Sequence, residues 1–255
     1  MATLNELYNI PILFKGIDEQ GLPPYELIVV DDGSTDGTKE CLRELAQRDE
    51  RIRPIFHEGR QTLIPAHCQG IRAATGEFVI IMDADLQHPP EILPAILRQL
   101  QNSTGLAIAS RFAVGGSPGD RPFLRTAIST CALLTAKFFL RHAKHVSDPI
   151  SGFYGFRRDV FIPVDPRWRG YELLPFLLAM CRRLAVVEVP YTFQPRCNGL
   201  SKIVSLNLAF IRVFLVELVL AVRFNRLLVT GAWFKRNPRG IGAGSSSSRH
   251  SELEA

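Results

Sequence analysis

The first half of the chain alternates short apolar runs with longer segments whose apolar residues recur at helical spacing. Four strands are predicted, at residues 26–30, 53–57, 78–82 and 106–109. The first, third and fourth are short apolar runs of the kind that fits a buried strand, and the second has Ile55 and Phe56 at its centre. Helical periodicity predicts helices over residues 5–17, 63–74 and 91–100, and another after residue 37 with Cys41, Leu42 and Leu45 on one side. This alternation predicts an α/β fold with a mostly parallel sheet and right-handed crossovers.

Three of the apolar runs end on polar residues. Parallel strands end at one edge of the sheet, where open α/β sheets bind their ligands. The polar ends are Asp31 and Asp32 after the first run, Asp83, Ala84 and Asp85 after the third, and Ser110 and Arg111 after the fourth. Carboxylates together with substrate phosphates are the usual ligands of Mg²⁺, and Gln87 could add a neutral oxygen. Alternatively, Asp83 and Asp85 only begin the turn before Pro89.

Residues 33–38, Gly-Ser-Thr-Asp-Gly-Thr, open the helix that follows the first carboxylate pair. Small polar residues at this position can cap a helix and leave backbone N–H groups free for a phosphate ligand. The same residues also fit a tight strand-to-helix turn without a ligand.

Composition limits the classes of function. The 255 residues, 46% of them hydrophobic, are enough for one large α/β domain with or without an appendage. The net charge of +5 suits an anionic partner, but the basic residues are spread out, so we expect no nucleic acid. Five cysteines without Cys-x-x-Cys spacing indicate reduced thiols in a reducing compartment. The first residues have no basic-then-apolar pattern, so we expect no signal peptide.

Ordered motifs between Thr3 and Lys202 resemble those of family 2 glycosyltransferases with the GT-A fold. The motifs are VVDDGSTDGT at 29–38, MDADLQHPPE at 82–91 and SRF at 110–112. Two further motifs, SDPISGF at 147–153 and RCNGLSK at 196–202, resemble the polyprenyl-phosphate sugar transferases of that family, as does QHPP. The motifs in this order are much more specific than any one alone.

The resemblance implies roles for individual residues. The nucleotide-sugar site would comprise Glu6, Val30, Asp32, Asp83, Ala84, Asp85, Arg111, Arg196 and Lys202. Asp85 and Gln87 would hold Mg²⁺ or Mn²⁺, and Arg125 and Ser129, spaced i and i+4 on a helix, would face the acceptor phosphate. The catalytic set would be Asp83, Asp85, Arg111 and Asp148.

The implied reaction is metal-dependent, inverting transfer of mannose from GDP-mannose to a polyprenyl phosphate such as dolichyl phosphate. The enzyme would act at the cytoplasmic face of a membrane as a peripheral protein, with a small membrane-anchoring subunit as a potential partner. Alternatives are transfer of another sugar, such as glucose from UDP-glucose, or a non-catalytic subunit with the same fold. A haloacid-dehalogenase-like phosphatase is disfavoured, because Gln87 stands where that motif has Thr or Val.

Two departures from the family pattern concern the nucleotide side. The family's first strand ends in P-x-Y-N-E, but Ala2 and Leu4 replace the proline and tyrosine here, and the strand before them is expected to be missing. Loss of that strand would remove one face of the nucleotide pocket and is the basis of the non-catalytic alternative. Thr62 stands where the family has a glycine, which could alter that loop.

Several other residues carry weaker expectations. We expect His88 to be structural or to orient the donor, and His57 and His67 to be surface or packing residues. Asp148 could serve as a base, or shape the loop at residues 151–153. Glu172 could bind sugar hydroxyls.

The predicted catalytic domain spans residues 1–202. Residues 203–239 form a predicted apolar or amphipathic helical segment, in which Arg212, Glu217 and Arg223 argue against a transmembrane helix. This segment either lies in the membrane interface or packs on the catalytic domain. Residues 240–255 form a predicted disordered tail.

Overall fold

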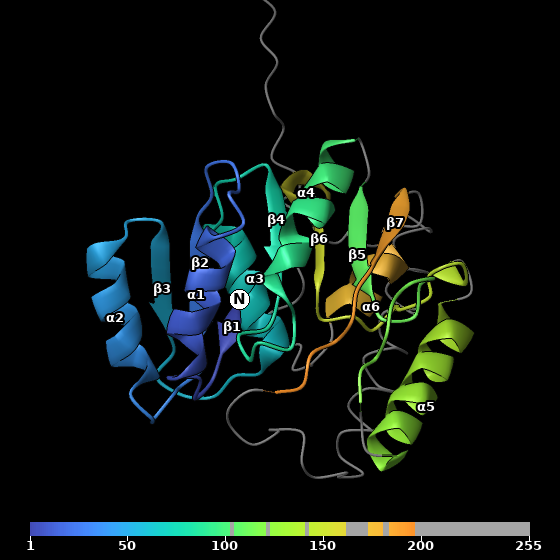
Figure 1. The fold of residues 1–255 in the computed structure, drawn as a ribbon, viewed down its shortest axis with the longest axis horizontal. Coiled ribbons are helices and arrows are strands. Elements are labelled where there is room, and N and C mark those ends of the chain that lie inside the picture. The colour runs from blue at the N-terminus through green and yellow to red at the C-terminus, as the bar shows by residue number, and fades with distance from the viewer. Residues whose placement is uncertain (103–104, 121–122, 141–142, 162–172, 181–183, 197–255) are drawn as a thin grey trace, which may run out of the picture.

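A computed structural model describes residues 1–102, 105–120, 123–140, 143–161, 173–180 and 184–196. Within these ranges, helices cover both faces of a central layer of β-strands (Figure 1). No helix in these ranges is both long enough and apolar enough to cross a lipid bilayer.

The first sheet contains three parallel strands in the order β1-β2-β3. They are β1 (Ala2–Thr3), β2 (Leu27–Asp31) and β3 (Ile52–Phe56). The helices that follow them are α1 (Asn9–Asp18), α2 (Thr38–Arg48) and α3 (Leu63–Ala73). Asp31 pairs with Phe56, so β2 and β3 end at the same edge of the sheet.

The second sheet has the order β4-β6-β5-β7. Its strands are β4 (Phe78–Ile81), β5 (Leu106–Ser110), β6 (Tyr154–Arg157) and β7 (Val186–Pro190). β6 is antiparallel to both of its neighbours, whereas β5 and β7 are parallel. Its helical elements are η1 (Pro90–Ile92), α4 (Leu93–Gln101), α5 (Phe123–Phe139), η3 (Arg158–Val160) and α6 (Leu173–Met180).

The core lies on both faces of the strands, because successive side chains of a strand point to opposite faces. Apolar side chains of α1, α2 and α4 pack on one face, where Val29 of the first sheet and Ala107 of the second belong to the same cluster. Apolar side chains of α3 and α6 pack on the other face, against β4, β5 and β6. The cluster on the first of these faces therefore spans both sheets.

Gly155 of β6 lies directly beneath α4. α4 packs directly on this residue, and a Cβ atom there would come within 2.9 Å of side-chain atoms of Ile96 and Leu100. The missing side chain brings the helix close to the sheet, so the glycine is a packing requirement.

The structure confirms the predicted alternation and the mostly parallel sheet, and corrects two details. The first strand is not missing: Ala2 and Thr3 form β1 and pair with Val30 and Asp31. The first helix begins at Asn9 rather than at residue 5, because the chain turns at residue 5, where φ is +52°.

Part of the predicted organisation falls outside the described residues. This is the case for the helical segment 203–239, the tail 240–255, Lys202 and Glu172.

Candidate active site

Loops that follow β1, β2 and β4 meet at one edge of the molecule. The Asn5 N–H donates to Ser34 Oγ at 2.8 Å, and the Glu6 N–H donates to Thr38 Oγ1 at 3.0 Å, which fastens the first loop to the second. The charges of Glu6 and Asp85 both act on Asp83, which places all three carboxylates in one region. The structure therefore brings Glu6 close to the Asp83–Asp85 pair.

Asp85 and Gln87 lie in a tight loop after β4. Both side chains are buried, and Leu86 between them has a φ of +64°. One Asp85 oxygen accepts the Gln87 N–H at 3.1 Å, and the other forms an ion pair with Arg196. The Gln87 side chain donates to the carbonyl of Gln194 at 3.2 Å. The loop is thus joined to the segment that carries Arg196.

Asp83 and His88 face each other across this loop. Burial, and then the charge of Asp85, raise the pKa of Asp83, while Arg196 opposes that rise. His88 Nδ1 accepts the Asp83 N–H at 3.0 Å, so the proton of the neutral ring lies on Nε2, 4.0 Å from an Asp83 oxygen. The ring stacks on Phe153 with its centroid 5.1 Å away. These contacts hold the ring in place, as either role expected for His88, structural or donor-orienting, requires.

Arg111 and Asp148 form a buried bidentate ion pair. The Arg111 guanidinium donates to the two Asp148 oxygens at 2.7 and 2.8 Å, and the Arg111 backbone N–H donates at 3.1 Å. Glu188 on β7 accepts the backbone N–H groups of Ser147 and Asp148 and so holds the loop. Because both of its oxygens bind Arg111, Asp148 is placed to position that arginine rather than to act as a base.

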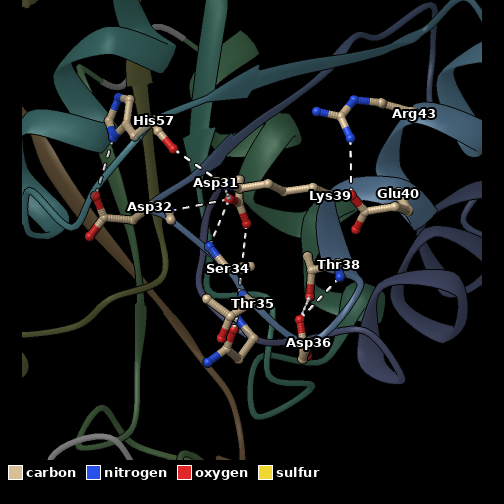
Figure 2. Close-up of polar contacts among 12 residues, drawn as sticks. Asp31, Asp32, Ser34, Thr35, Asp36, Thr38, Lys39, Glu40, Arg43 and His57 are labelled. Carbon is tan, nitrogen blue, oxygen red and sulfur yellow. Dashed lines mark hydrogen bonds and ion pairs between the residues drawn. The ribbon is translucent and has the colours of Figure 1, made fainter.

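The carboxylate pair after β2 has two different environments (Figure 2). Asp31 is fully buried and accepts hydrogen bonds from Gly33 and Ser34, which closes the turn before α2. Asp32 instead faces the loop after β3, where it meets His57 and the backbone of residues 61 and 62. Asp31 therefore shapes the turn, and Asp32 is the carboxylate turned toward the loop.

Not all predicted site residues present a side chain at this edge. The Val30 side chain packs in the core against Ala66, and Ala84 is also part of the core. Arg125 and Ser129 lie on α5, which stands beside the second sheet, away from β1–β3 (Figure 1). Residues 30 and 84 can therefore contribute only backbone atoms to the predicted pocket.

His57 is buried, which agrees with the packing alternative and not with a surface position. It also contacts Asp32, a contact that the sequence interpretation did not anticipate. Its position directly after β3, at the edge where β2 also ends, is the signal that could have identified it.

Oxygen atoms in the loop after β4 fit a divalent cation only in part. In the described portion of the chain, no three His, Cys, Asp or Glu side chains gather to form a metal cage. Asp83, Asp85 and Gln87 supply fewer ligands than such a cage. A small set of protein ligands is nevertheless usual for Mg²⁺ when the phosphates of a substrate complete its coordination shell.

The sequence model described as glycosyl transferase family 2 matches residues 1–164. The chain belongs to glycosyltransferase family 2. Within this family, a relative named dolichol-phosphate mannosyltransferase from Pyrococcus furiosus is 37% identical over 205 residues, which are 80% of this chain and 58% of the relative. A protein of the same name from Saccharomyces cerevisiae is 35% identical over 75% of this chain and 73% of its own length. The chain thus spans little more than half of the Pyrococcus relative.

Solved structures support the GT-A fold of this family 2 chain. Glucosyl-3-phosphoglycerate synthase from Mycobacterium tuberculosis, solved with Mn²⁺, UDP and its product, has a TM-score of 0.63 and 19% identity. The match covers 88% of this chain and 77% of that protein. The agreement confirms the predicted fold class.

Proposed function

We propose that this chain transfers mannose from GDP-mannose to the phosphate of a polyprenol such as dolichol. The observation that carries the proposal is the Asp83–Asp85 pair facing Arg196 at the end of β4, in a chain whose relatives are named for this reaction. In this proposal, the carboxylates and the arginine bind the diphosphate of the donor, and the loop after β2 lines the site of its nucleoside.

The acceptor explains why the site needs no strong base. A phosphate monoester is ionised at neutral pH, so its oxygen can attack the anomeric carbon without first losing a proton to the enzyme. Asp148 is fully occupied by Arg111, and His88 Nδ1 by a backbone N–H, which suits them to positioning. The proposed reaction is an in-line displacement with inversion, driven by positioning and electrostatics.

Asp85 and Gln87 are the proposed protein ligands for Mg²⁺ or Mn²⁺. When bound there, the cation would neutralise charge that develops on the departing diphosphate. The Mycobacterium tuberculosis protein named above was solved with Mn²⁺ and UDP. In this chain, Arg196 pairs with one of the two oxygens of Asp85, so a cation held by Asp85 would have to share that carboxylate with the arginine.

Arg196 and Arg111 are the proposed phosphate contacts of the described residues. A guanidinium can bond two oxygens of one phosphate, and Phe193 lies beneath the Arg111 guanidinium, 5.6 Å from it. Lys202 would add a charge, and Arg125 and Ser129 would bind the acceptor phosphate. The proposed location is the cytoplasmic face of a membrane, where the polyprenyl chain is anchored, with a small membrane subunit as an optional partner.

The test is transfer of radiolabelled mannose from GDP-mannose to dolichyl phosphate, with Mg²⁺, with EDTA, and with Asp85→Ala. We expect a lipid-linked product with Mg²⁺ alone, and its loss in the other two reactions. If UDP-glucose gives a product and GDP-mannose gives none, the proposed donor is wrong and UDP-glucose takes its place. If neither donor gives product, the catalytic proposal is wrong.

A further inference from the structure

The strand ends of β2 and β3 place an imidazole against a carboxylate. His57 Nδ1 lies 3.2 Å from Asp32 Oδ1, and both side chains are buried (Figure 2). Among the described residues, this ring is the side-chain partner of Asp32, whose other hydrogen bonds come from backbone N–H groups. The contact joins residues 25 positions apart.

The backbone of His57 is held on both sides. Its N–H donates to the Asp31 carbonyl at 2.9 Å, which extends the ladder between β2 and β3 by one residue. Its carbonyl accepts the ammonium of Lys39 at 3.4 Å. The ring is therefore attached to a fixed point of the sheet and not to a free loop.

The orientation of the ring is also fixed. Nε2 contacts the side-chain amide of Gln69, which comes from α3. Nδ1 faces Asp32, which can only accept, so Nδ1 donates its proton to the carboxylate. Nε2 of the neutral ring is then the acceptor, and the Gln69 amide meets it with its NH2 group. The chain of contacts thus runs from α3 through the ring to Asp32.

Asp32 has acceptor capacity left after these contacts. Oδ1 accepts from the Gln61 N–H at 2.7 Å and from His57, and Oδ2 accepts from the Thr62 N–H at 3.1 Å. An ionised carboxylate offers about four acceptor positions, so one remains for a ligand. Which direction that position faces depends on the angle at which His57 and the loop hold the carboxylate.

We propose that His57 is a positioning residue for donor binding, which orients Asp32 toward an N–H group of the nucleotide base. The inference rests on the proposed function and on the place of Asp32 in the nucleotide-sugar site that the family resemblance implies. Gln69 takes part in the same role, because its contact with Nε2 fixes the orientation of the His57 ring. His57 acts only on the nucleoside half of the donor, and the diphosphate is held elsewhere by Arg196 and the loop after β4.

The experiment compares binding of two probes to the full chain by titration calorimetry with Mg²⁺ present. GDP reports on the base and diphosphate together, whereas inorganic pyrophosphate reports on the diphosphate alone. The variants are His57→Phe, which keeps a ring and removes the donor, and His57→Asn, whose amide can replace Nδ1–H. Gln69→Met removes the anchor and leaves the ring.

We expect His57→Phe to weaken GDP binding about tenfold and leave pyrophosphate binding unchanged, as befits one hydrogen bond to a charged group. The KM for GDP-mannose should rise by a similar factor with kcat within about twofold. His57→Asn should recover most of the loss, and Gln69→Met should show a smaller loss in the same direction. Far-UV circular dichroism of each variant confirms that it is folded.

Failure of this inference is distinguishable from failure of the proposed function. If the wild type binds GDP and His57→Phe binds it equally well, the positioning role is wrong and the transferase proposal stands. Equal weakening of GDP and pyrophosphate by His57→Phe, without recovery in His57→Asn, also overturns the role, because it indicates general damage. A wild type that binds no nucleotide overturns both.

Discussion

Replacing Thr62 by glycine should stabilise the protein. Thr62 precedes α3 with φ +114° and ψ 169°, a region of backbone space that is occupied almost only by glycine. It is held there because its N–H donates to Asp32 at 3.1 Å. The Thr62 hydroxyl is also buried without a hydrogen-bond partner among the described residues.

The size of the effect follows from two opposing contributions. Holding a residue other than glycine in this region costs roughly 1–3 kcal/mol, which the substitution relieves. A glycine has a more flexible unfolded state, which costs about 0.4–1 kcal/mol. We therefore expect a net gain of about 1 kcal/mol in the free energy of unfolding, or about 2–4 °C in Tm for a chain of this size.

Urea unfolding monitored by far-UV circular dichroism measures this gain. Thr62→Ala is the matched control, because it removes the hydroxyl but keeps the Cβ atom that causes the strain. Thr62→Gly should be more stable than Thr62→Ala. If the glycine variant is equally or less stable, the strain assigned to Thr62 does not exist.

Three further predictions concern buried charge. Burial lowers the pKa of His67 to about 3 from its ordinary 6.5, so the folded state resists a proton that the unfolded state accepts. The free energy of unfolding should therefore fall by about 1.4 kcal/mol per pH unit as the pH drops below 6.5. Urea unfolding at several pH values should show a smaller fall for His67→Leu than for the wild type. Asp148→Asn leaves the Arg111 charge unbalanced and should lower the free energy of unfolding by about 3 kcal/mol; a loss below about 1 kcal/mol in urea unfolding would contradict the buried ion pair. Arg196→Gln removes the positive charge that pairs with Asp85, so the affinity for Mn²⁺ in the absence of nucleotide should rise several-fold. Electron paramagnetic resonance measures this affinity. An unchanged affinity would rule out competition between Arg196 and the metal ion for Asp85.

The sequence alone predicted those elements whose structure depends on residues adjacent in the chain. The run from residue 78 to Met82 predicts β4 because four apolar residues followed by carboxylates fit a strand buried on both faces. The same logic located β2, with Asp31 and Asp32 at its end, and β5, with Ser110 and Arg111 at its end. The motifs that resemble the family predicted the fold, which the comparisons confirm.

Contacts between distant segments were beyond the sequence. Nothing in the local pattern shows that residues 154–157 insert between β4 and β5, because that pairing joins segments about 50 to 75 residues apart in the chain. The Arg111–Asp148 and His57–Asp32 pairs likewise join residues 37 and 25 positions apart. A side chain's partner across strands depends on register, which a single sequence does not reveal.

The order of strands in the second sheet has a consequence for how the chain folds during synthesis. β1, β2 and β3 pair with one another once residue 56 has emerged from the ribosome, whereas β4 and β5 find their shared partner only with residues 154–157. β7 completes the sheet later still, at residues 186–190. Because non-local pairing is slow and unpaired apolar strands aggregate, β4 and β5 are the segments of a nascent chain that most need a chaperone.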